Sequence, residues 1–222
     1  MRCATLFAAF ALTIVWPTAN AFAQSCPRPD ERATVSVRVL DSGVHLDHTR
    51  SQGELGAIAS QQGLGSPGTI RGITAAPELL AQTSVRVMTR SSGGDSCAHP
   101  VSVEVVIGWR QQQIIYVQRD YPVGSCQYSV VYRHEQGHAQ VNIDTLRETA
   151  RLLEDGLRAA VNHSSYPIRV PSELWARDNI SSSMRDVTRG YVAAFARART
   201  ERNQMLDTPQ NYRATSLLCP SW

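Results

Sequence analysis

The sequence of 222 residues contains no lysine, so all 22 of its fixed positive side chains are arginines. The formal net charge is only +3, and the arginines are spread along the chain instead of being concentrated in one segment. Nucleic-acid-binding domains carry a clustered basic patch, so this composition argues against a nucleic-acid partner. No Cys-x-x-Cys pair occurs either, which argues against a metal cluster held by cysteines.

The chain also lacks an apolar run of the roughly 20 residues that a helix needs to cross a bilayer. One shorter apolar run, which follows Arg2 and ends near Pro17, has the charge and length of a secretory signal peptide. Two small residues, Ala21 and Ala23, then occupy the two positions that a signal peptidase recognises. We therefore predict a signal peptide at 1–23, cleavage after Ala23, and a mature bacterial protein that is periplasmic or secreted and has no membrane span.

Cysteine is scarce, and the mature chain would keep four residues of this type, Cys26, Cys97, Cys126 and Cys219. An even number of cysteines in a chain bound for an oxidising compartment predicts two disulfides. Four cysteines allow three pairings. We favour Cys26 with Cys219, which would tie the two ends of the mature chain together, and Cys97 with Cys126.

Four segments of the first half alternate apolar and polar residues or cluster β-branched ones, which is typical of strands. These segments are residues 35–40, 85–88, 101–107 and 114–117. Because only residues 108–113 separate the last two segments, we predict that they form an antiparallel hairpin. The stretch 51–77 is rich in glycine and serine and is predicted to be a loop, apart from a short helical turn near Leu55.

The second half of the chain has a helical pattern. Apolar residues recur every three or four positions over residues 130–161, which predicts an amphipathic helix of roughly thirty residues. A second helical pattern covers residues 183–205, starts with a capping-box sequence at Ser183 and ends before Pro209. Strands followed by helices predict one α+β domain over residues 24–222, with the helices on one face of a small, largely antiparallel sheet.

The first predicted helix contains His134-Glu135-Gln136-Gly137-His138, which is a His-Glu-x-x-His motif. Residues four apart share a helix face, so both imidazoles can bind one zinc ion while Glu135 projects beside them. Zinc lowers the pKa of a coordinated water to about 7, and Glu135 would take its proton as the water attacks a carbonyl group. Gly137 costs about 1 kcal/mol of helix stability relative to alanine, which indicates a close approach at this position.

A catalytic zinc ion needs a third protein ligand, and the sequence offers several candidates. Glu201 on the second helix is the first choice, as in gluzincins, although Met205 stands where the usual aspartate would be. The lower-ranked candidates are Asp186, Asp207 and His163. Asp144 matches the spacing of metzincins, but in a continuous helix it would point away from the two histidines. The sequence does not select an oxyanion-stabilising residue among its tyrosines and arginines.

Three segments carry a resemblance to a known family: residues 97–100 (CAHP), 119–126 (RDYPVGSC) and 130–138 (VVYRHEQGH). In these segments the chain resembles a group of uncharacterised secreted proteobacterial proteins that are described as predicted zinc-dependent proteases. The resemblance extends over residues 97–157, and more loosely over 203–219. It implies export, a minimal zincin-like fold and a zinc site, and the functional positions that it carries over are His134, Glu135 and His138.

These observations predict a secreted or periplasmic zinc-dependent metallopeptidase that hydrolyses peptide bonds in a peptide or protein substrate. The competing hypothesis is a non-catalytic envelope protein that uses the helix as a structural metal site or as a partner-binding face. The third ligand discriminates between the two, because a catalytic zinc ion keeps three protein ligands and leaves the fourth position to water.

Overall fold

The computed structural model describes residues 26–27, 31–63, 70–92, 95–163 and 165–222, and the signal peptide predicted at 1–23 lies outside the described residues. In chain order the elements are β1 (Thr34–Leu40), β2 (Val44–Asp47), α1 (Gln52–Gln61), β3 (Gly72–Ala75), β4 (Leu80–Ser92), β5 (Asp95–Gly108), β6 (Gln113–Val117), α2 (Cys126–Val161), β7 (Ile168–Val170), α3 (Glu173–Leu206) and α4 (Pro209–Ser216). This is the predicted α+β fold. No helix of the described part is both long and apolar enough to cross a membrane.

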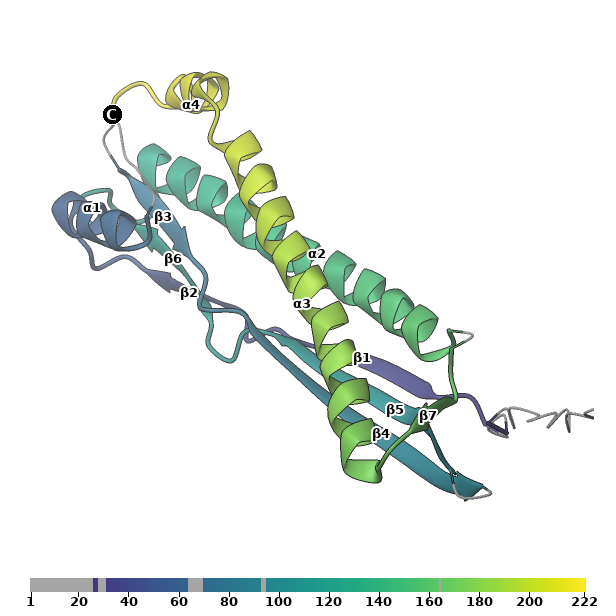
Figure 1. Ribbon diagram of the computed structural model, residues 1–222. Helices are drawn as coiled ribbons and strands as arrows, with labels where there is room; N and C mark the ends of the chain where they lie inside the picture. The colour runs from purple at the N-terminus through teal and green to yellow at the C-terminus, as the bar shows by residue number, and fades with distance from the viewer. Residues whose placement is uncertain (1–25, 28–30, 64–69, 93–94, 164) are drawn as a thin grey trace, which may run out of the picture.

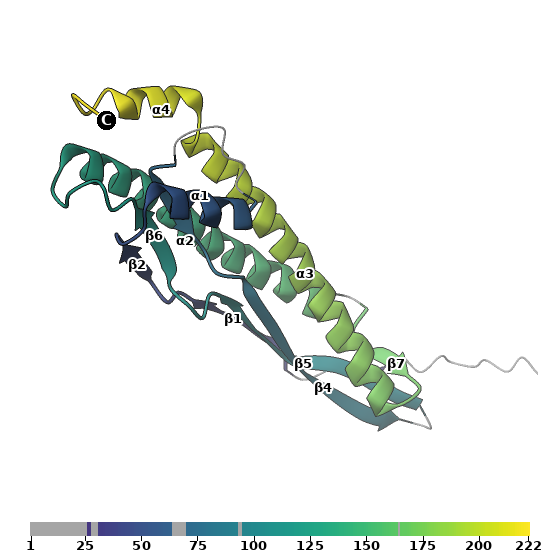
Figure 2. The same cartoon turned by 90° about the vertical axis from the view of Figure 1, so that its left-hand side faces the viewer.

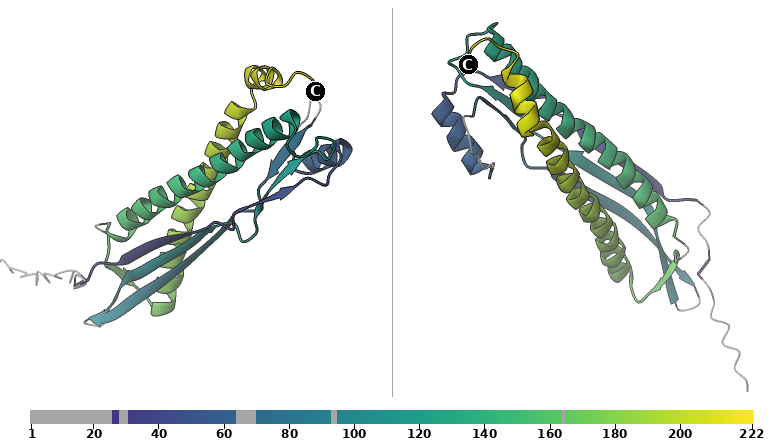
Figure 3. Two further views of the ribbon diagram at one scale, coloured as in Figure 1. Left: turned by 180° about the vertical axis from the view of Figure 1, so that it is seen from behind. Right: turned by 90° about the horizontal axis from the view of Figure 1, so that it is seen from above.

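The long helices α2 and α3 lie on one face of the sheet and cross each other over it (Figure 1). Seen from behind, the strands lie in front of both helices (Figure 3, left). The alternation within β5 explains this layering, because Val103, Val105 and Ile107 are fully buried whereas Glu104 between them is exposed. The largest hydrophobic cluster therefore fills the space between this part of the sheet and the two helices.

Two sheets follow each other end to end and have the same arrangement of strands. In the first, β5 lies between β1, which is parallel to it, and β4, which is antiparallel. In the second, β6 lies between β2, again parallel, and β3, again antiparallel. Where the two sheets meet, the N–H groups of Trp109 and Gln113 donate to the carbonyls of Leu40 and Gly43, both at 3.0 Å. The short strand β7 pairs with the start of β5.

The hairpin predicted between residues 101–107 and 114–117 is wrong, because the chain runs on from β5 into β6 without reversing. The residues between them form an interruption of the sheet and not a turn. Gly108 has a φ of +139°, and the Leu40 carbonyl leaves no room for a Cβ atom there. Trp109 is 1% exposed and packs against Phe195 of α3, which fixes the interruption in the core.

The stretch 51–77 contains more regular structure than the predicted loop. Helix α1 replaces the single turn expected near Leu55, and it begins with a capping box formed by Ser51 and Glu54. Two glycines within α1 lower its helix propensity and hide it from a sequence pattern. Strand β3 follows, and its Ile73 packs against α1, so this stretch builds one end of the molecule.

Helix α3 begins at Glu173, well before the predicted start at Ser183. Its N-cap is Ser172, whose side chain accepts a hydrogen bond from the main-chain N–H of Trp175 in the first turn of α3. The additional turns bury Ile180 in a small cluster with Ala98 of β5. The true start is therefore set by a cap and by packing against β5 and β7, and not by the capping-box pattern at Ser183.

Two disulfides are present, as predicted, but the predicted pairing is wrong. Cys26 pairs with Cys97, and Cys126 pairs with Cys219. Cys97 cannot reach Cys126, because β5 and β6 run on in one direction and together span roughly 60 Å between Cys97 and the end of β6. Cys97 and Cys126 consequently belong to opposite ends of the molecule. Two disulfides fit an oxidising, extracytoplasmic compartment.

Candidate metal centre

Helix α2 presents His134 and His138 on one face, in its N-terminal half. The N-terminal part of α2 lies at the end of the molecule where α1 and α4 also lie (Figure 2). The Nε2 atoms of the two rings are 3.2 Å apart, and the ring planes are nearly perpendicular at 86°. The side chains are mostly buried, with 18% of His134 and 11% of His138 exposed. Both Nε2 atoms therefore face the same point in space.

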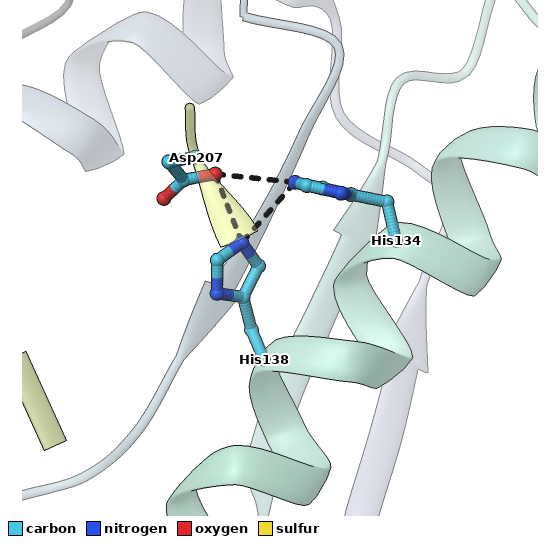
Figure 4. Close-up of side chains that lie close together, drawn as sticks. All are labelled: His134, His138 and Asp207. Atoms are coloured by element: carbon cyan, nitrogen blue, oxygen red, sulfur yellow. Dashed lines mark hydrogen bonds and ion pairs between the residues drawn. The ribbon is translucent and has the colours of Figure 1, made fainter. Parts of the chain in front are cut away.

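The third group at this point is Asp207, which directly follows the last turn of α3. Its Oδ1 atom lies 3.2 Å from Nε2 of His134 and 3.1 Å from Nε2 of His138 (Figure 4). Donor atoms that bind one zinc ion tetrahedrally, with bonds of about 2.05 Å, are about 3.3 Å from each other. The observed triangle fits this spacing, so the three side chains form a group that can hold a metal ion.

Three atoms with lone pairs at this distance repel each other unless a proton or a cation lies between them. Burial lowers the pKa of His138, but the hydrogen bond to Asp207 and the nearby charge of Glu135 more than offset this and raise it to about 9. For Asp207 burial acts in the opposite direction and raises the pKa. Hydrogen bonds from both histidines and from Tyr212 outweigh it and hold the pKa of Asp207 well below its usual range. Without metal, a proton thus occupies the place that a cation would take.

Glu135 of the motif is buried, with 5% of the residue exposed, and contacts strand β3. The hydroxyl of Thr74 lies 2.8 Å from its Oε2 atom and 2.8 Å from its main-chain oxygen. Burial raises the pKa of the Glu135 carboxyl, and the charges of the two histidines and the Thr74 hydrogen bond offset this only in part. A carboxylate with a raised pKa is suited to accept a proton at neutral pH.

The close approach in this site is at Gly72 of β3 and not at Gly137 of the motif, where the sequence predicted it. A Cβ atom at Gly72 would lie 2.6 Å from Cγ1 of Val131 and 2.9 Å from Oε1 of Glu135. A Cβ atom at Gly137 would lie 3.5 Å from Cδ1 of Leu206, which is an ordinary van der Waals contact. The glycine that the site requires therefore comes from the stretch that was predicted to be a loop.

Helix α4 brings Tyr212 to the same point. Its hydroxyl donates to Oδ1 of Asp207 at 2.7 Å, and its ring lies 5.6 Å from the ring of His134. The disulfide between Cys126 and Cys219 fastens the segment after α4 to the first turn of α2. The sequence could not select this tyrosine from the others, because its place depends on a disulfide pairing that was predicted incorrectly.

Asp207 takes the place that was predicted for Glu201. Glu201 is exposed and is not part of the metal-binding group. It lies about 9 Å before Asp207 along the axis of α3, at about 1.5 Å per residue. Asp144, Asp186 and His163 also lie outside this group and form hydrogen bonds with residues close to them in the sequence. Asp144 is exposed on the continuous helix α2, as the helical geometry predicted.

No family model, no curated protein and no solved structure matches this chain. Its function has therefore to be inferred from the geometry of the site. Three side chains that could hold a metal ion, with a buried carboxylate beside them, are the groups that metal-assisted hydrolysis requires.

Proposed function

We propose that this chain is a zinc-dependent metallopeptidase with His134, His138 and Asp207 as protein ligands and Glu135 as the general base. The observation that carries the proposal is the triangle of two Nε2 atoms and one Oδ1 atom, with sides of 3.1 to 3.2 Å. Two imidazoles and one carboxylate form a donor set that catalytic zinc uses, with the fourth position left open. Zinc is proposed over other divalent ions because imidazole donors and a tetrahedral spacing suit it.

A bound zinc ion would supply the Lewis acid that lowers the pKa of water and polarises a carbonyl group. Glu135 would move the proton. Thr74 holds its Oε2 atom, and burial raises the pKa of its carboxyl, so it can accept a proton from the attacking water and pass it to the leaving nitrogen. The Tyr212 hydroxyl donates its one hydrogen to Oδ1 of Asp207, so this tyrosine would orient the proposed carboxylate ligand.

An extended peptide is proposed as the substrate because of strand β3. Within the described part of the chain, β3 pairs only with β6, and its other edge is free of a strand partner. The carbonyl of Arg71 accepts from the N–H of Gln118, so the alternation of an antiparallel pair directs the N–H and C=O groups of Gly72 and Thr74 to the free edge. A peptide that pairs with this edge would lie next to Glu135, which Thr74 contacts.

We infer that the protein acts outside the cytoplasm, in the periplasm or after secretion. The two disulfides support this location. The signal-peptide pattern at residues 1–23 provides a route of export. The resemblance of residues 97–157 to secreted proteobacterial proteins described as predicted zinc-dependent proteases agrees with both export and zinc.

A non-catalytic metal site is the second candidate function, and one observation favours it. Two ligands come from α2 and the third follows α3, so a bound metal ion would also cross-link the two long helices. Metal binding that couples to folding in this way is typical of structural sites. The two candidates differ in a single outcome, since only the peptidase loses an activity when Glu135 is changed.

The test compares the wild type with Glu135→Gln in bound zinc and in hydrolysis of a mixture of fluorogenic peptides. Glutamine cannot accept the proton, so the variant should bind zinc as the wild type does and lose hydrolysis by about 100-fold or more. Asp155→Asn, which changes an exposed carboxyl on the same helix, is the matched control and should keep the activity. Wild-type hydrolysis by Glu135→Gln would exclude the proposed base. Zinc binding without hydrolysis by any of the proteins would favour the structural site.

A further inference from the structure

The ring of His138 has a second polar contact on the side opposite to the metal centre. Its Nδ1 atom lies 2.7 Å from Oδ1 of Asn203 on α3. The Nδ2 atom of Asn203 lies 2.9 Å from the main-chain oxygen of Arg199 and 3.0 Å from Oδ1 of Asn142. Asn142 donates in turn from Nδ2 to Oε1 of Gln113 at 2.8 Å. A chain of three side-chain amides therefore leads from His138 to the start of β6.

The Arg199 carbonyl fixes the direction of every hydrogen bond in this chain. A carbonyl oxygen only accepts, so the Asn203 atom beside it must be the NH₂ group, and the atom beside His138 must be Oδ1. Because an amide oxygen only accepts, Nδ1 of His138 must carry the hydrogen. A neutral imidazole carries one N–H, which leaves the lone pair on Nε2. This is the nitrogen that faces His134 and Asp207.

The rest of the amide chain is deeply buried. Asn142 is 4% exposed and Gln113 is 2% exposed. Gln113 opens β6 at the point where the two sheets meet, and its own N–H donates to the carbonyl of Gly43. Buried amides are costly unless they are hydrogen-bonded, and apolar side chains of similar size would avoid that cost. Each of these amides is hydrogen-bonded in a series that ends at the ring of His138.

We propose that Asn203 is a positioning residue of the metal centre, and that Asn142 and Gln113 hold its amide in the required orientation. This proposal rests on the proposed metal-binding role of His138. By accepting the N–H of Nδ1, Asn203 keeps the Nε2 lone pair directed at the metal position and prevents the ring from turning over. Partners of this kind orient the histidine ligands of metal sites, and their removal typically costs about 10- to 100-fold in metal affinity.

The test measures zinc affinity by competition with a chelator for the full chain with both disulfides intact. Asn203→Leu should bind zinc about 10- to 100-fold more weakly than the wild type. Asn203→Asp keeps an acceptor for the Nδ1–H group but loses the donor to the Arg199 carbonyl, so it should bind zinc more tightly than Asn203→Leu without reaching the wild-type affinity. Gln204→Leu changes an exposed amide on the next position of α3 and serves as the matched control, which should bind zinc normally.

Asn142→Leu tests the rest of the series of hydrogen-bonded amides. Alone, it should weaken zinc binding by less than Asn203→Leu, because the Arg199 carbonyl still holds the Asn203 amide. Combined with Asn203→Leu, it should cause no further loss, since it acts only through Asn203. A purely structural role for Asn142 would instead give additive losses in the double variant.

A spectroscopic measurement keeps the proposal testable if a variant does not fold. Nitrogen-15 spectra of histidine-labelled wild type with zinc should show the His138 ring bound through Nε2 and protonated at Nδ1. Zinc bound through Nδ1, or zinc affinities of folded Asn203→Leu and wild type within about threefold, would overturn the inference while leaving the metal centre intact. A wild type that binds no zinc would overturn the metal centre as well, and the Glu135→Gln comparison tests the hydrolysis separately.

Discussion

Zinc binding at this centre should release a proton, because in the metal-free protein His138 holds one. Burial opposes protonation of this ring, but the hydrogen bond to Asp207 and the charge of Glu135 outweigh burial and raise the pKa of His138 to about 9. At pH 7 the Nε2 lone pair is then free in only about 1 of 100 molecules, since pH and pKa differ by about two units. The apparent zinc affinity at pH 7 should consequently be about 100-fold weaker than above pH 9, which corresponds to about 2.7 kcal/mol.

Chelator competition between about pH 6 and pH 8.5 measures this dependence, and the affinity should rise by about tenfold per pH unit. Calorimetry at pH 7 in two buffers with different ionisation enthalpies counts the released protons, and His138 should contribute about one per zinc ion. Asp207 should contribute none, because its pKa is held below the usual range and it is already ionised. An affinity that changes by less than about threefold per pH unit, or release of less than about half a proton, would refute this reasoning.

Asp207→Asn provides the comparison that connects the proton to this site. The substitution removes the group that does most to raise the pKa of His138, so less proton release is expected at pH 7 even though zinc also binds more weakly. Asp144→Asn changes an exposed carboxyl on α2 and is the matched control. Equal proton release from the Asp207→Asn variant and the control would show that another group binds the proton.

Two glycine substitutions should have opposite effects on stability, measured by urea unfolding with both disulfides intact. Gly137→Ala should raise the free energy of unfolding by about 1 kcal/mol, because a Cβ atom there makes only an ordinary contact with Leu206 and alanine favours the helix. Gly72→Ala should lower it by about 1–3 kcal/mol, because a Cβ atom there overlaps Val131 and Glu135. Gly72→Ala should also reduce hydrolysis while zinc stays bound. The contacts assigned to the two glycines would be wrong if Gly137→Ala lowered the free energy of unfolding and Gly72→Ala raised it.

The sequence predicts those parts of the fold whose signal is local. The alternation over residues 35–40 and the helical period over residues 130–161 correspond to β1 and to most of α2. Pairing partners have no local signal, because glycine and polar residues occur both in hairpin turns and where a sheet is interrupted. At residues 108–112 the deciding feature is the burial of Trp109 against Phe195, which is a contact between distant parts of the chain.

The disulfide pairing, which was predicted from the idea that one bridge ties the two ends of the mature chain together, had no local signal either. A hairpin would have brought the region after residue 117 back towards Cys97, so pairing Cys97 with Cys126 was consistent with the predicted topology. With β5 and β6 continuous, Cys126 belongs to the end where the chain also returns after α4, and Cys219 becomes its partner. Tyr212 reaches the metal centre by the same return of the chain, which is why the sequence could not single it out.

In the candidate metal centre, too, the local sequence predicts some of the residues, and contacts between distant parts of the chain place the others. His134, Glu135 and His138 lie within one turn of one helix, so their spacing alone determines how they face each other. Asp207 depends on how α3 crosses α2, and the packing of buried residues of both helices, such as Leu153 and Phe195, sets that crossing. One pattern in the sequence does point to it, because Asn203 and Asp207 have the same four-residue spacing as the two histidines. Because of this spacing, Asn203 and Asp207 contact the ring of His138 from opposite sides. Asn203 lies beside its Nδ1 atom and Asp207 beside its Nε2 atom.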